Sequence, residues 1–336
     1  MQTYSAERLS SQYRDQLIPY FKQYGDSCMS YSGFQAGLEY FFIKEVGYIA
    51  YLPYQHFIFS PRKRAIALAN PVCAKENIAY LLQQFIKTYP KSMFVQISRE
   101  VAIILDQLGY QINQFGIETE IAIQDYDLKG KAKSSLRQWR NKCQREQVKV
   151  EEIDLAQCNQ IEEIKLLSQA WLENKGGKQL SFLNRPFLYQ NEKDTRCFIA
   201  KQQGRLLGIA VFDPLYRNNK IYGYYHNIDR ILKTAPHGVS PYLILKAMDI
   251  FRQEKVEILS LGMSPLYQLG AEFNYNKILR KILRFSYKNM NFLYSFKGNI
   301  HHKKKFAGKQ KRVYFSSAQG NNLWEIFILI KAIGIY

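Results

Sequence analysis

The sequence predicts an α+β fold in which one unit of mixed sheet and flanking helices occurs twice. Residues 70–98 and 235–264 each read as a loop, then a helix with apolar residues at helical spacing, then a short strand. The 336-residue chain also contains 25 Tyr and 21 Phe, which favour strands. At 47% hydrophobic residues it can bury a sizeable core, which argues against wholesale disorder.

The first unit is predicted to contain two helices and two strands. Its first helix is marked by apolar residues on one helical face, namely Ile78, Leu81, Leu82, Phe85 and Ile86. A strand follows at 93–97, with the sequence MFVQI. Residues 99–110, REVAIILDQLGY, predict a second helix, and residues 118–124, ETEIAIQ, predict a second strand.

The second unit is predicted to open with antiparallel strands over residues 196–227, with turns at Gln203-Gly204 and Asn218-Asn219. A helix with a strand, EILSL at 257–261, should follow. The helix is marked by Leu243, Ala247, Met248, Ile250 and Phe251.

Strands followed by a loop, a helix and a further strand are the order of the GNAT acyltransferase unit. The chain therefore resembles a tandem duplicated GNAT fold, an acyl-CoA N-acyltransferase-like arrangement of mixed sheets flanked by helices. The resemblance implies a degenerate GNAT-like domain over 1–127, a basic connecting helix over 128–150 and a catalytic GNAT-like domain over 151–336.

Positive charge is confined to two stretches of the chain. Residues 273–324 contain twelve Lys or Arg and no acid, and residues 128–150 contain eight bases against Glu146 alone. Together they account for the whole net charge of +19. Such segregation predicts a surface that meets a polyanion. The alternative is a protein that is merely basic throughout.

Each stretch supplies candidate polyanion contacts. SLRQWRNKCQRE predicts a helix that begins at Ser134 or Ser135 and carries Lys133, Arg137 and Arg140 on one face, where they can meet the phosphates of a nucleic acid. In the second stretch the candidates are Lys297, Lys303 and Lys305. We expect that segment to be extended or loosely turned, with Lys303 and Lys305 on one face. The alternatives are an ordinary solvated helix face and a solvated basic loop.

Several classes of protein are disfavoured. The five cysteines form no CxxC pair, which fits a reducing compartment and argues against a disulfide framework or a zinc ribbon. The five histidines have no metal-ligand spacing, and His301 and His302 would point apart in a strand, so we expect no metal and no cofactor. We expect a cytoplasmic protein, either free or peripheral at the membrane. The apolar segment 323–336 suits a core helix or an interfacial helix.

Four stretches in register resemble one family, the C-terminal catalytic domain of phosphatidylglycerol lysyltransferases (lysyl-phosphatidylglycerol synthases). They are LKGKAKSSLRQWRN at 128–141, SQAWL at 168–172, LSLGMSPL at 259–266 and YSFKGNIHHKKKF at 294–306. The chain departs from the family where D-L-M-R is replaced by NIDR at 227–230, G-x-x-D by GVSP at 238–241 and E-K-G-F-S-L-G by GKQLSFL at 177–183. The missing carboxylates would partner an aminoacyl ammonium, so the amino acid and its acceptor stay open.

The resemblance implies transfer of an aminoacyl group from aminoacyl-tRNA to a phospholipid headgroup or a soluble acceptor. Aminoacyl-tRNA and an anionic phospholipid surface are therefore the expected partners. The implied catalytic residues lie at 226–230. Asp229 or His226 would act as base and Arg230 as the anion or oxyanion partner, while Asn227 stands at the family's acidic position. The alternative role for Asp229 is a carboxylate paired with Arg230.

Strand geometry constrains these roles. Because residues alternate across an extended strand, His226 and Arg230 should share one face and Asn227 and Asp229 the other, unless a bulge intervenes.

The substrate cleft is expected to include Gly238, Gly262 and Ser264. Gly262 would permit a sharp exit or a bulge after its strand, and the alternative is a simple turn glycine.

The sequence is also compatible with two other functions. The first is an acyl-CoA-dependent GNAT N-acyltransferase, whose Q/R-x-x-G-x-G/A turn cradles pyrophosphate with backbone N–H groups. Here residues 235–240 keep only Gly238 of that turn, and Pro236 donates no N–H, which disfavours CoA. The second is a non-catalytic relative that binds tRNA or a membrane.

Overall fold

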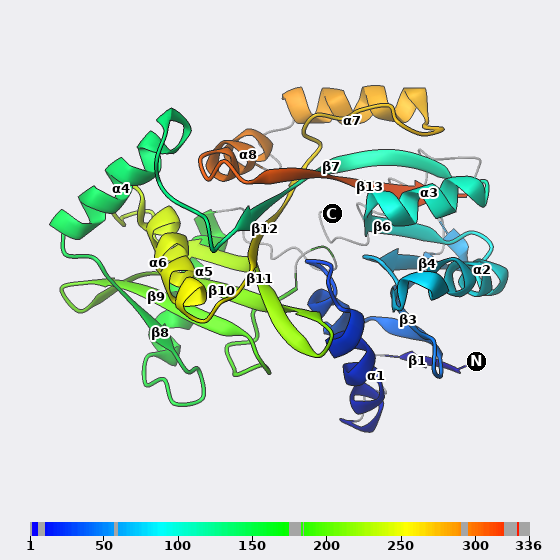
Figure 1. The fold of residues 1–336 in the computed structure, drawn as a ribbon, viewed down its shortest axis with the longest axis horizontal. Coiled ribbons are helices and arrows are strands. Elements are labelled where there is room, and N and C mark those ends of the chain that lie inside the picture. Colours follow the sequence, from blue (N-terminus) through cyan, green and yellow to red (C-terminus); the bar gives the residue numbers. More distant parts are fainter. Residues whose placement is uncertain are drawn as a thin grey trace.

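The computed structural model describes residues 2–5, 11–56, 60–174, 183, 185–289, 295–318 and 328 (Figure 1). The helices are α1 (Ser11–Tyr24), α2 (Ile78–Thr88), α3 (Arg99–Gln107), α4 (Ser134–Arg145), α5 (Ile161–Asn174), α6 (Val239–Gln253), α7 (Lys277–Asn289) and α8 (Phe296–Lys304), with short 3-10 turns η2 (Tyr31–Phe34), η3 (Lys75–Asn77) and η4 (Lys131–Lys133). The strands are β1 (Gln2–Ser5), β2 (Glu39–Ile43), β3 (Gly47–His56), β4 (Ser60–Leu68), β5 (Val72–Cys73), β6 (Met93–Ile97), β7 (Gln111–Ala122), β8 (Lys149–Ile153), β9 (Arg196–Gln202), β10 (Arg205–Arg217), β11 (Lys220–Ile231), β12 (Ile258–Pro265) and β13 (Lys309–Ser317).

The described strands form one continuous mixed sheet. Its order is β1-β2-β3-β4-β6-β13-β7-β12-β11-β10-β9-β8, with β5 paired to β3. The last strand of the chain, β13, lies between β6 and β7 and is antiparallel to both. The two halves of the molecule are joined by the antiparallel pair β7 and β12.

The repeated unit predicted from the sequence is present in both halves. In the first unit, antiparallel β2, β3 and β4 lead through α2 to β6, which pairs in parallel with β4. In the second unit, antiparallel β8 to β11 lead through α6 to β12, which pairs in parallel with β11. The turns at Gln203-Gly204 and Asn218-Asn219 fall where predicted, between β9, β10 and β11. The four helices predicted from the sequence are present in the structure as α2, α3, α4 and α6.

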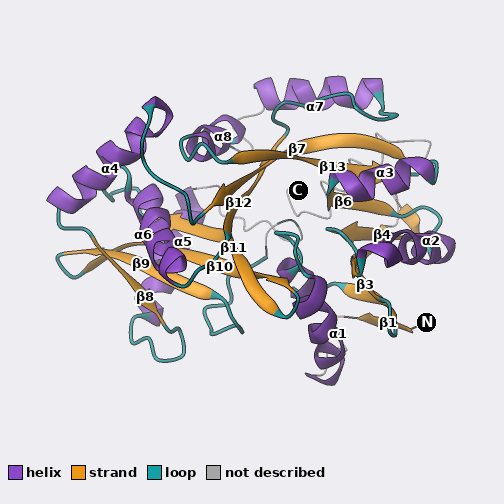
Figure 2. Cartoon of the chain, in the orientation of Figure 1, coloured by secondary structure: helices purple, strands orange, loops and turns teal. Residues whose placement is uncertain are grey.

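Helices cover the sheet on both faces (Figure 2). In the second half, α6 packs with α4 over Phe198 and Phe212, whereas α5 packs over Ile199 and Ile209 on the opposite face. Successive residues of a strand point to opposite faces, which is why neighbouring residues enter different cores. A further core cluster joins residues of both halves, among them Tyr40 and Tyr225. No helix among the described residues is long and apolar enough to cross a membrane.

The expected conformation of the second basic stretch is wrong. Residues 296–304 form helix α8 rather than an extended or loosely turned segment. At 100° per residue, Lys303 and Lys305 then point in different directions, and His301 and His302 are helix neighbours rather than strand neighbours. The apolar segment 323–336 lies outside the described residues, apart from Ile328.

Candidate functional site

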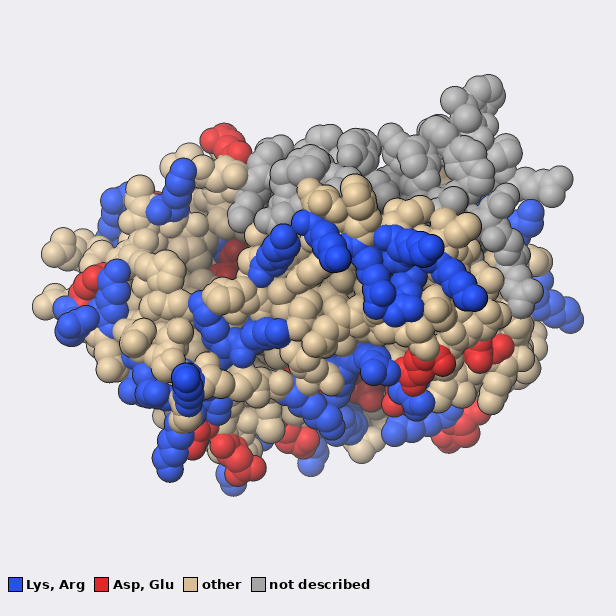
Figure 3. Space-filling view, turned by 90° about the horizontal axis from the view of Figure 1, so that it is seen from above, with Lys and Arg blue, Asp and Glu red and all other residues tan. Residues whose placement is uncertain are grey.

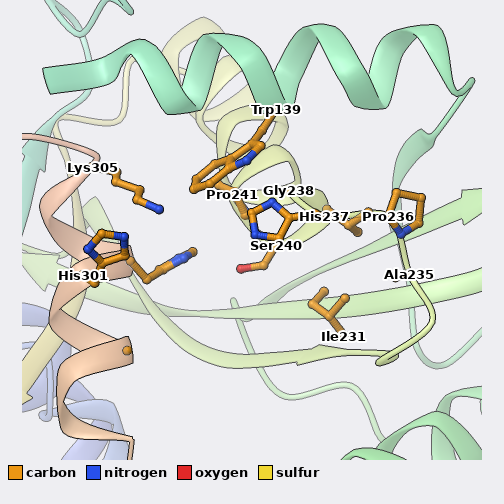
Figure 4. A pocket seen from close by; sticks show the side chains of 13 residues that line it. Trp139, Ile231, Ala235, Pro236, His237, Gly238, Ser240, Pro241, His301 and Lys305 are labelled. Atoms are coloured by element: carbon orange, nitrogen blue, oxygen red, sulfur yellow. The ribbon is translucent and has the colours of Figure 1, made fainter. Parts of the chain in front are cut away.

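A pocket lined by both polar and apolar residues lies where α4, α8 and the N-terminus of α6 meet. Its volume is about 290 Å³, and its wall comes from three parts of the chain that are distant in sequence. Trp139 comes from α4, and Ile231 with residues 235–241 comes from the end of β11 and the turn that enters α6. Gly298, His301, His302 and Lys305 come from α8 and its end. In Figure 4, Trp139 faces His301 and Lys305 across this space, with Ser240 between them. The two basic stretches of the sequence therefore meet at one pocket.

Gly238 sets the shape of the pocket at the start of α6. It is the N-cap of α6 and has φ of 104°, in the left-handed region that favours glycine. An added Cβ would lie 2.5 Å from the Cβ of Trp139. Gly238 therefore lets the turn pass directly beneath the indole, and its role in substrate binding stays a prediction.

Lys305 and His237 both pack against the indole of Trp139 in the pocket wall. The Nζ of Lys305 lies 4.1 Å from the centroid of the Trp139 ring, and burial lowers the pKa of Lys305. The imidazole of His237 packs against the same indole with ring centroids 5.1 Å apart. A cation held over an indole in a partly dry site is well placed to meet an anionic group.

Asp229 reaches the pocket through Ser240. The Ser240 hydroxyl donates a 2.6 Å hydrogen bond to a carboxylate oxygen of Asp229, and Ser240 lines the pocket. The bulge that the sequence left open is present, because Val211 pairs with Ile228 while the next residue, Phe212, pairs with His226. The extra residue is Asn227. It puts His226 and Asp229 on the same face of β11, an arrangement that the strand pattern allowed only with a bulge.

Arg230 lies on the other face of β11 from His226, because the bulge at Asn227 shifts the alternation that would have put them together. Its side chain is 2% exposed and is enclosed by the rings of Trp171, Phe187 and Tyr189, each about 5.9 Å from the guanidinium carbon. It donates a 2.8 Å hydrogen bond to the Tyr189 hydroxyl. Arg230 therefore faces α5 and does not line the pocket.

The face that carries Arg230 also has a buried ionic network. Arg185 binds Asp213 with two nitrogens, at 2.6 and 3.2 Å, and also pairs with Glu192. The amide of Asn227 donates to the Arg185 carbonyl at 3.4 Å, which ties the bulge to this network. Arg185 was not recognised from the sequence, because its partner carboxylates are separated from it in the chain.

A second group of titratable side chains is buried behind the pocket. The parallel pairing of β11 with β12 ends at Tyr225 and Ser260, and the two strands then diverge. Lys303 enters the opening from α8 and donates a 2.8 Å hydrogen bond to the Met263 carbonyl. It is 9% exposed, so the prediction that it lies on a surface for polyanions is wrong.

Burial controls the charge of this group. Burial lowers the pKa of Lys303 to about 8, while Cys28 and Glu118 oppose that shift. Burial raises the pKa of the Glu118 carboxyl, although the hydroxyl of Ser260 donates to it at 2.6 Å. Two imidazoles stay neutral near pH 7, because burial, assisted by nearby cations, lowers the pKa of His226 to about 3 and that of His302 to about 4. Neutral imidazoles can accept a hydrogen bond or a proton from a hydroxyl.

Gly262 and Ser264 shape β12 rather than line the pocket. Gly262 has φ of 72° and lies at a register shift between Ser260 and Met263, so the predicted bulge is present. The hydroxyl of Ser264 is buried and donates to Asn299 at 2.8 Å, which fixes α8 on the strand.

The remaining predicted cations lie away from the pocket wall. Lys133 and Arg137 donate to backbone carbonyls of residues 127–130, so both brace the loop that leads into α4. Arg140 is half-buried and donates to Asn141 at 3.4 Å. Lys297 is exposed at the start of α8 and donates to the Lys288 carbonyl at 3.2 Å.

Sequence reasoning missed much of the pocket wall, including Trp139, His237, Ser240, His301 and His302. Trp139 lies within the first basic stretch, and His301 and His302 lie within the second. Their places in these two stretches could have indicated that they belong to the site. Among the described residues, no group of His, Cys, Asp or Glu is placed to hold a metal ion.

The paired β–α–β units, the diverging strands β11 and β12 and the pocket at the N-terminus of α6 define a tandem GNAT-like protein. Solved structures agree with this fold. L-PGS from Bacillus licheniformis superposes with a TM-score of 0.78 at 19% identity, covering 96% of this chain and 97% of that one. A C-terminal DUF2156 domain from Agrobacterium fabrum gives 0.77 at 20% identity over 97% and 98%. FemX gives 0.55 at 10% identity over 98% and 100%.

Residues 19–316 match the family model described as phosphatidylglycerol lysyltransferase, C-terminal, and the chain belongs to that family. The phosphatidylglycerol lysyltransferase of Bacillus subtilis (strain 168) is 23% identical over 332 residues, which is 95% of this chain and 37% of that protein. A protein of the same name from Staphylococcus epidermidis is 20% identical over 273 residues, 79% of this chain and 32% of that protein. The chain thus spans about a third of the length of these curated relatives. Both the family resemblance and the α+β tandem GNAT-like fold predicted from the sequence are confirmed.

Proposed function

We propose that the protein is an acyltransferase that moves an aminoacyl group from aminoacyl-tRNA to an anionic phospholipid headgroup or a soluble acceptor. The family relatives named phosphatidylglycerol lysyltransferase favour a lipid hydroxyl as the acceptor. In this proposal the protein acts in the cytoplasm, at the membrane surface.

The observation that carries the proposal is the pocket at the N-terminus of α6. The positive end of the α6 dipole points at the pocket and Lys305 adds a cation on the facing wall, and both attract phosphate. Backbone N–H groups add less here, because Val239 N–H is bonded to the Pro236 carbonyl and Pro241 has none. Trp139 offers an aromatic surface on which an unpaired 3′ base can stack. An anionic nucleotide end fits these three features together, whereas an uncharged ligand would use none of the charge.

The chemistry requires one ester bond to break and another to form. The acceptor hydroxyl attacks the carbonyl carbon of the aminoacyl ester, loses its proton to a base, and releases the ribose hydroxyl of the tRNA, which takes up a proton. Asp229, acting through Ser240, and the neutral imidazoles of His302 and His226 are the groups proposed to hold or move that proton. Arg230 and Asn227 would bind an anionic group of a substrate that enters between the diverging strands β11 and β12 from the α5 side.

A pair of adjacent lysines provides the test of the tRNA site. Lys305 lies in the pocket, whereas Lys304 lies over the ring of Tyr267. The substitution Lys305→Met should weaken tRNA binding and reduce the slope of log affinity against log salt by about 0.7–0.9, the value for one phosphate contact. Lys304→Met is the matched control and should keep the wild-type slope. A flat salt response in the wild type would remove tRNA as the partner.

A second assay separates the alternative functions. The protein is incubated with mixed charged tRNAs and phosphatidylglycerol vesicles, or with acetyl-CoA and the same vesicles. Loss of the aminoacyl ester together with an aminoacylated lipid supports the proposal. Release of free CoA thiol would support an acyl-CoA-dependent enzyme, and no reaction with either donor would support a relative that only binds.

A further inference from the structure

Helix α7 carries an apolar stripe that the rest of the protein leaves exposed. Its sequence, KILRKILRFSYKN, contains five bases and no acid. Two of its leucines, Leu279 and Leu283, are buried in the core cluster shared by both halves and fix the helix to the molecule. At 100° per residue, Ile278, Ile282 and Phe285 form a second stripe beside this buried face.

This second stripe is unusual for the molecule. Ile278 is 62% exposed, Ile282 is 41% exposed and Phe285 is 63% exposed. Six large apolar side chains are exposed in the described part of the chain, and these three are half of them. They follow i, i+4, i+7 spacing, so they form one contiguous patch rather than scattered surface positions.

A row of lysines borders the apolar stripe on its other side. Lys277, Lys281 and Lys288 are exposed, and no ion pair between described residues involves them. By contrast, Arg280 and Arg284 turn back to the protein and donate to the Leu269 carbonyl at 3.3 and 2.8 Å. Figure 3, which views the molecule from above α7, shows Lys and Arg side chains gathered over this face.

We propose that α7 docks into the headgroup layer of an anionic phospholipid bilayer. The exposed stripe of Ile278, Ile282 and Phe285 would enter the boundary between headgroups and acyl chains. The lysine row would lie along the lipid phosphates. A helix with an apolar stripe, a cationic border and no acids has the chemistry of an interfacial membrane helix.

The composition of the patch favours a bilayer over the other occupants. RNA phosphates would engage the lysines but would leave the three apolar side chains in water. A second copy of the chain docked through the same patch would bring two lysine rows together, and like charges would oppose that contact.

The position of α7 also connects it with the pocket. Lys297, at the start of α8, donates to the carbonyl of Lys288, and the rings of Tyr287 and Phe296 are 6.3 Å apart. Docking through α7 would therefore place α8, which lines the pocket, close to the lipid surface. The choice of phosphatidylglycerol as the lipid rests on the proposed function, whereas the docking surface rests on α7 alone.

Flotation with vesicles tests the inference. The full chain should float with phosphatidylglycerol vesicles and should not float with phosphatidylcholine vesicles. The triple variant Ile278→Ser, Ile282→Ser, Phe285→Ser should bind phosphatidylglycerol vesicles at least tenfold more weakly. The matched control is Tyr80→Ser, Leu166→Ser, Leu188→Ser, which removes the three exposed apolar side chains that lie elsewhere and should bind as the wild type does. Thermal unfolding of both variants checks that they are folded.

Three outcomes would overturn the inference. In the first, the α7 variant binds vesicles as tightly as the wild type does. In the second, the wild type self-associates with increasing concentration and the α7 variant does not, which would assign the patch to a second copy of the chain. In the third, the α7 variant loses tRNA binding and keeps vesicle binding, which would assign the patch to RNA. If instead the wild type binds vesicles through α7 but transfers no aminoacyl group, the proposed function fails and the docking inference stands.

Discussion

In the first β–α–β unit the two parallel strands stay together to their ends, whereas in the second unit they separate. After β4, the amide of Ala69 donates to the Val95 carbonyl at 2.9 Å, and the side chain of Asn70 accepts from the amide of Ser98 at 2.9 Å. These bonds hold the two parallel strands of the first unit together at their ends, so no opening forms between them. In the second unit β11 leaves β12 after Tyr225, and Lys303 of α8 occupies the opening. One architecture therefore yields a closed scaffold and an open site.

The difference comes from a few local features rather than from the order of elements. The open unit has a bulge at Asn227, a left-handed glycine at the N-cap of α6 and a left-handed glycine in β12. In the closed unit Asn77 caps α2 with a right-handed backbone, and the first turn has no glycine. The first unit has irregular backbone too, since Ala69 and Gln96 are left-handed and β6 shifts register against β13. The features found in the second unit alone are therefore the bulge in β11 and the glycine at the N-cap of α6.

The largest effect should come from substituting Gly238 in the open unit. Gly238→Ala places a Cβ in a left-handed residue and against Trp139, so it should lower the free energy of unfolding by about 1–3 kcal/mol and weaken tRNA binding about tenfold or more. Gly109→Ala is the control, because Gly109 has φ of 82° but nothing within 4 Å of its Cβ position. The control should lose stability and keep tRNA affinity, as measured by thermal unfolding and filter binding. Equal affinity in both variants would contradict the assigned role of Gly238.

An intermediate effect is expected from the acid sensitivity of the open unit. The pKa of His302 is about 4 when folded, below its ordinary 6.5, because the ring is buried. As pH falls through 6.5 the unfolded chain takes up the proton first, so stability is complete above pH 6.5 and declines toward pH 4. Between pH 7 and pH 5, His302→Gln should therefore lose about 1–2 kcal/mol less of its free energy of unfolding than the wild type loses. Urea unfolding at both pH values measures this difference.

The adjacent residue serves as the comparison for this pH effect. His301 is exposed on the same helix, so His301→Gln is the matched control that leaves the ring of His302 in place. The burial of His302 would be the wrong explanation if both variants behaved alike.

The smallest effect should appear in the closed unit. Asn70→Ala removes the acceptor for the amide of Ser98 and should lower the free energy of unfolding by about 1 kcal/mol. Because Asn70 does not line the pocket between α4, α6 and α8, tRNA affinity per folded molecule should not change. Asn70→Asp keeps an acceptor oxygen and should restore most of the stability. A loss of tRNA binding in Asn70→Ala would show that the two units are functionally coupled.

Local periodicity explains what could be predicted from the sequence. The apolar spacing in α2, α3 and α6 and the turn residues between β9, β10 and β11 are properties of contiguous residues, and the structure has them where expected. The four family motifs likewise depend on short contiguous stretches.

Features set by distant partners could not be predicted in the same way. α8 has no apolar periodicity, since its sequence is FKGNIHHKK, and its helix is fixed by contacts such as Asn299 with Ser264. The surroundings of Lys303 come from residues far away in the chain, with the Met263 carbonyl as its acceptor and Glu118 and Cys28 close enough to raise its pKa. The face of β11 on which Arg230 lies depends on the register of β10, which produces the bulge.

The position of β13 has a consequence for how the chain is made. β6 and β7 are both synthesised before residue 123, yet the strand that joins them ends at Ser317. At ribosomal rates of about 5–20 residues per second, roughly 10–40 s pass before that strand emerges. During this time the nascent chain displays two strand edges without their final neighbour, and such edges invite aggregation. We therefore expect co-translational folding to stall at the first half and chaperones to hold it until β13 has left the ribosome.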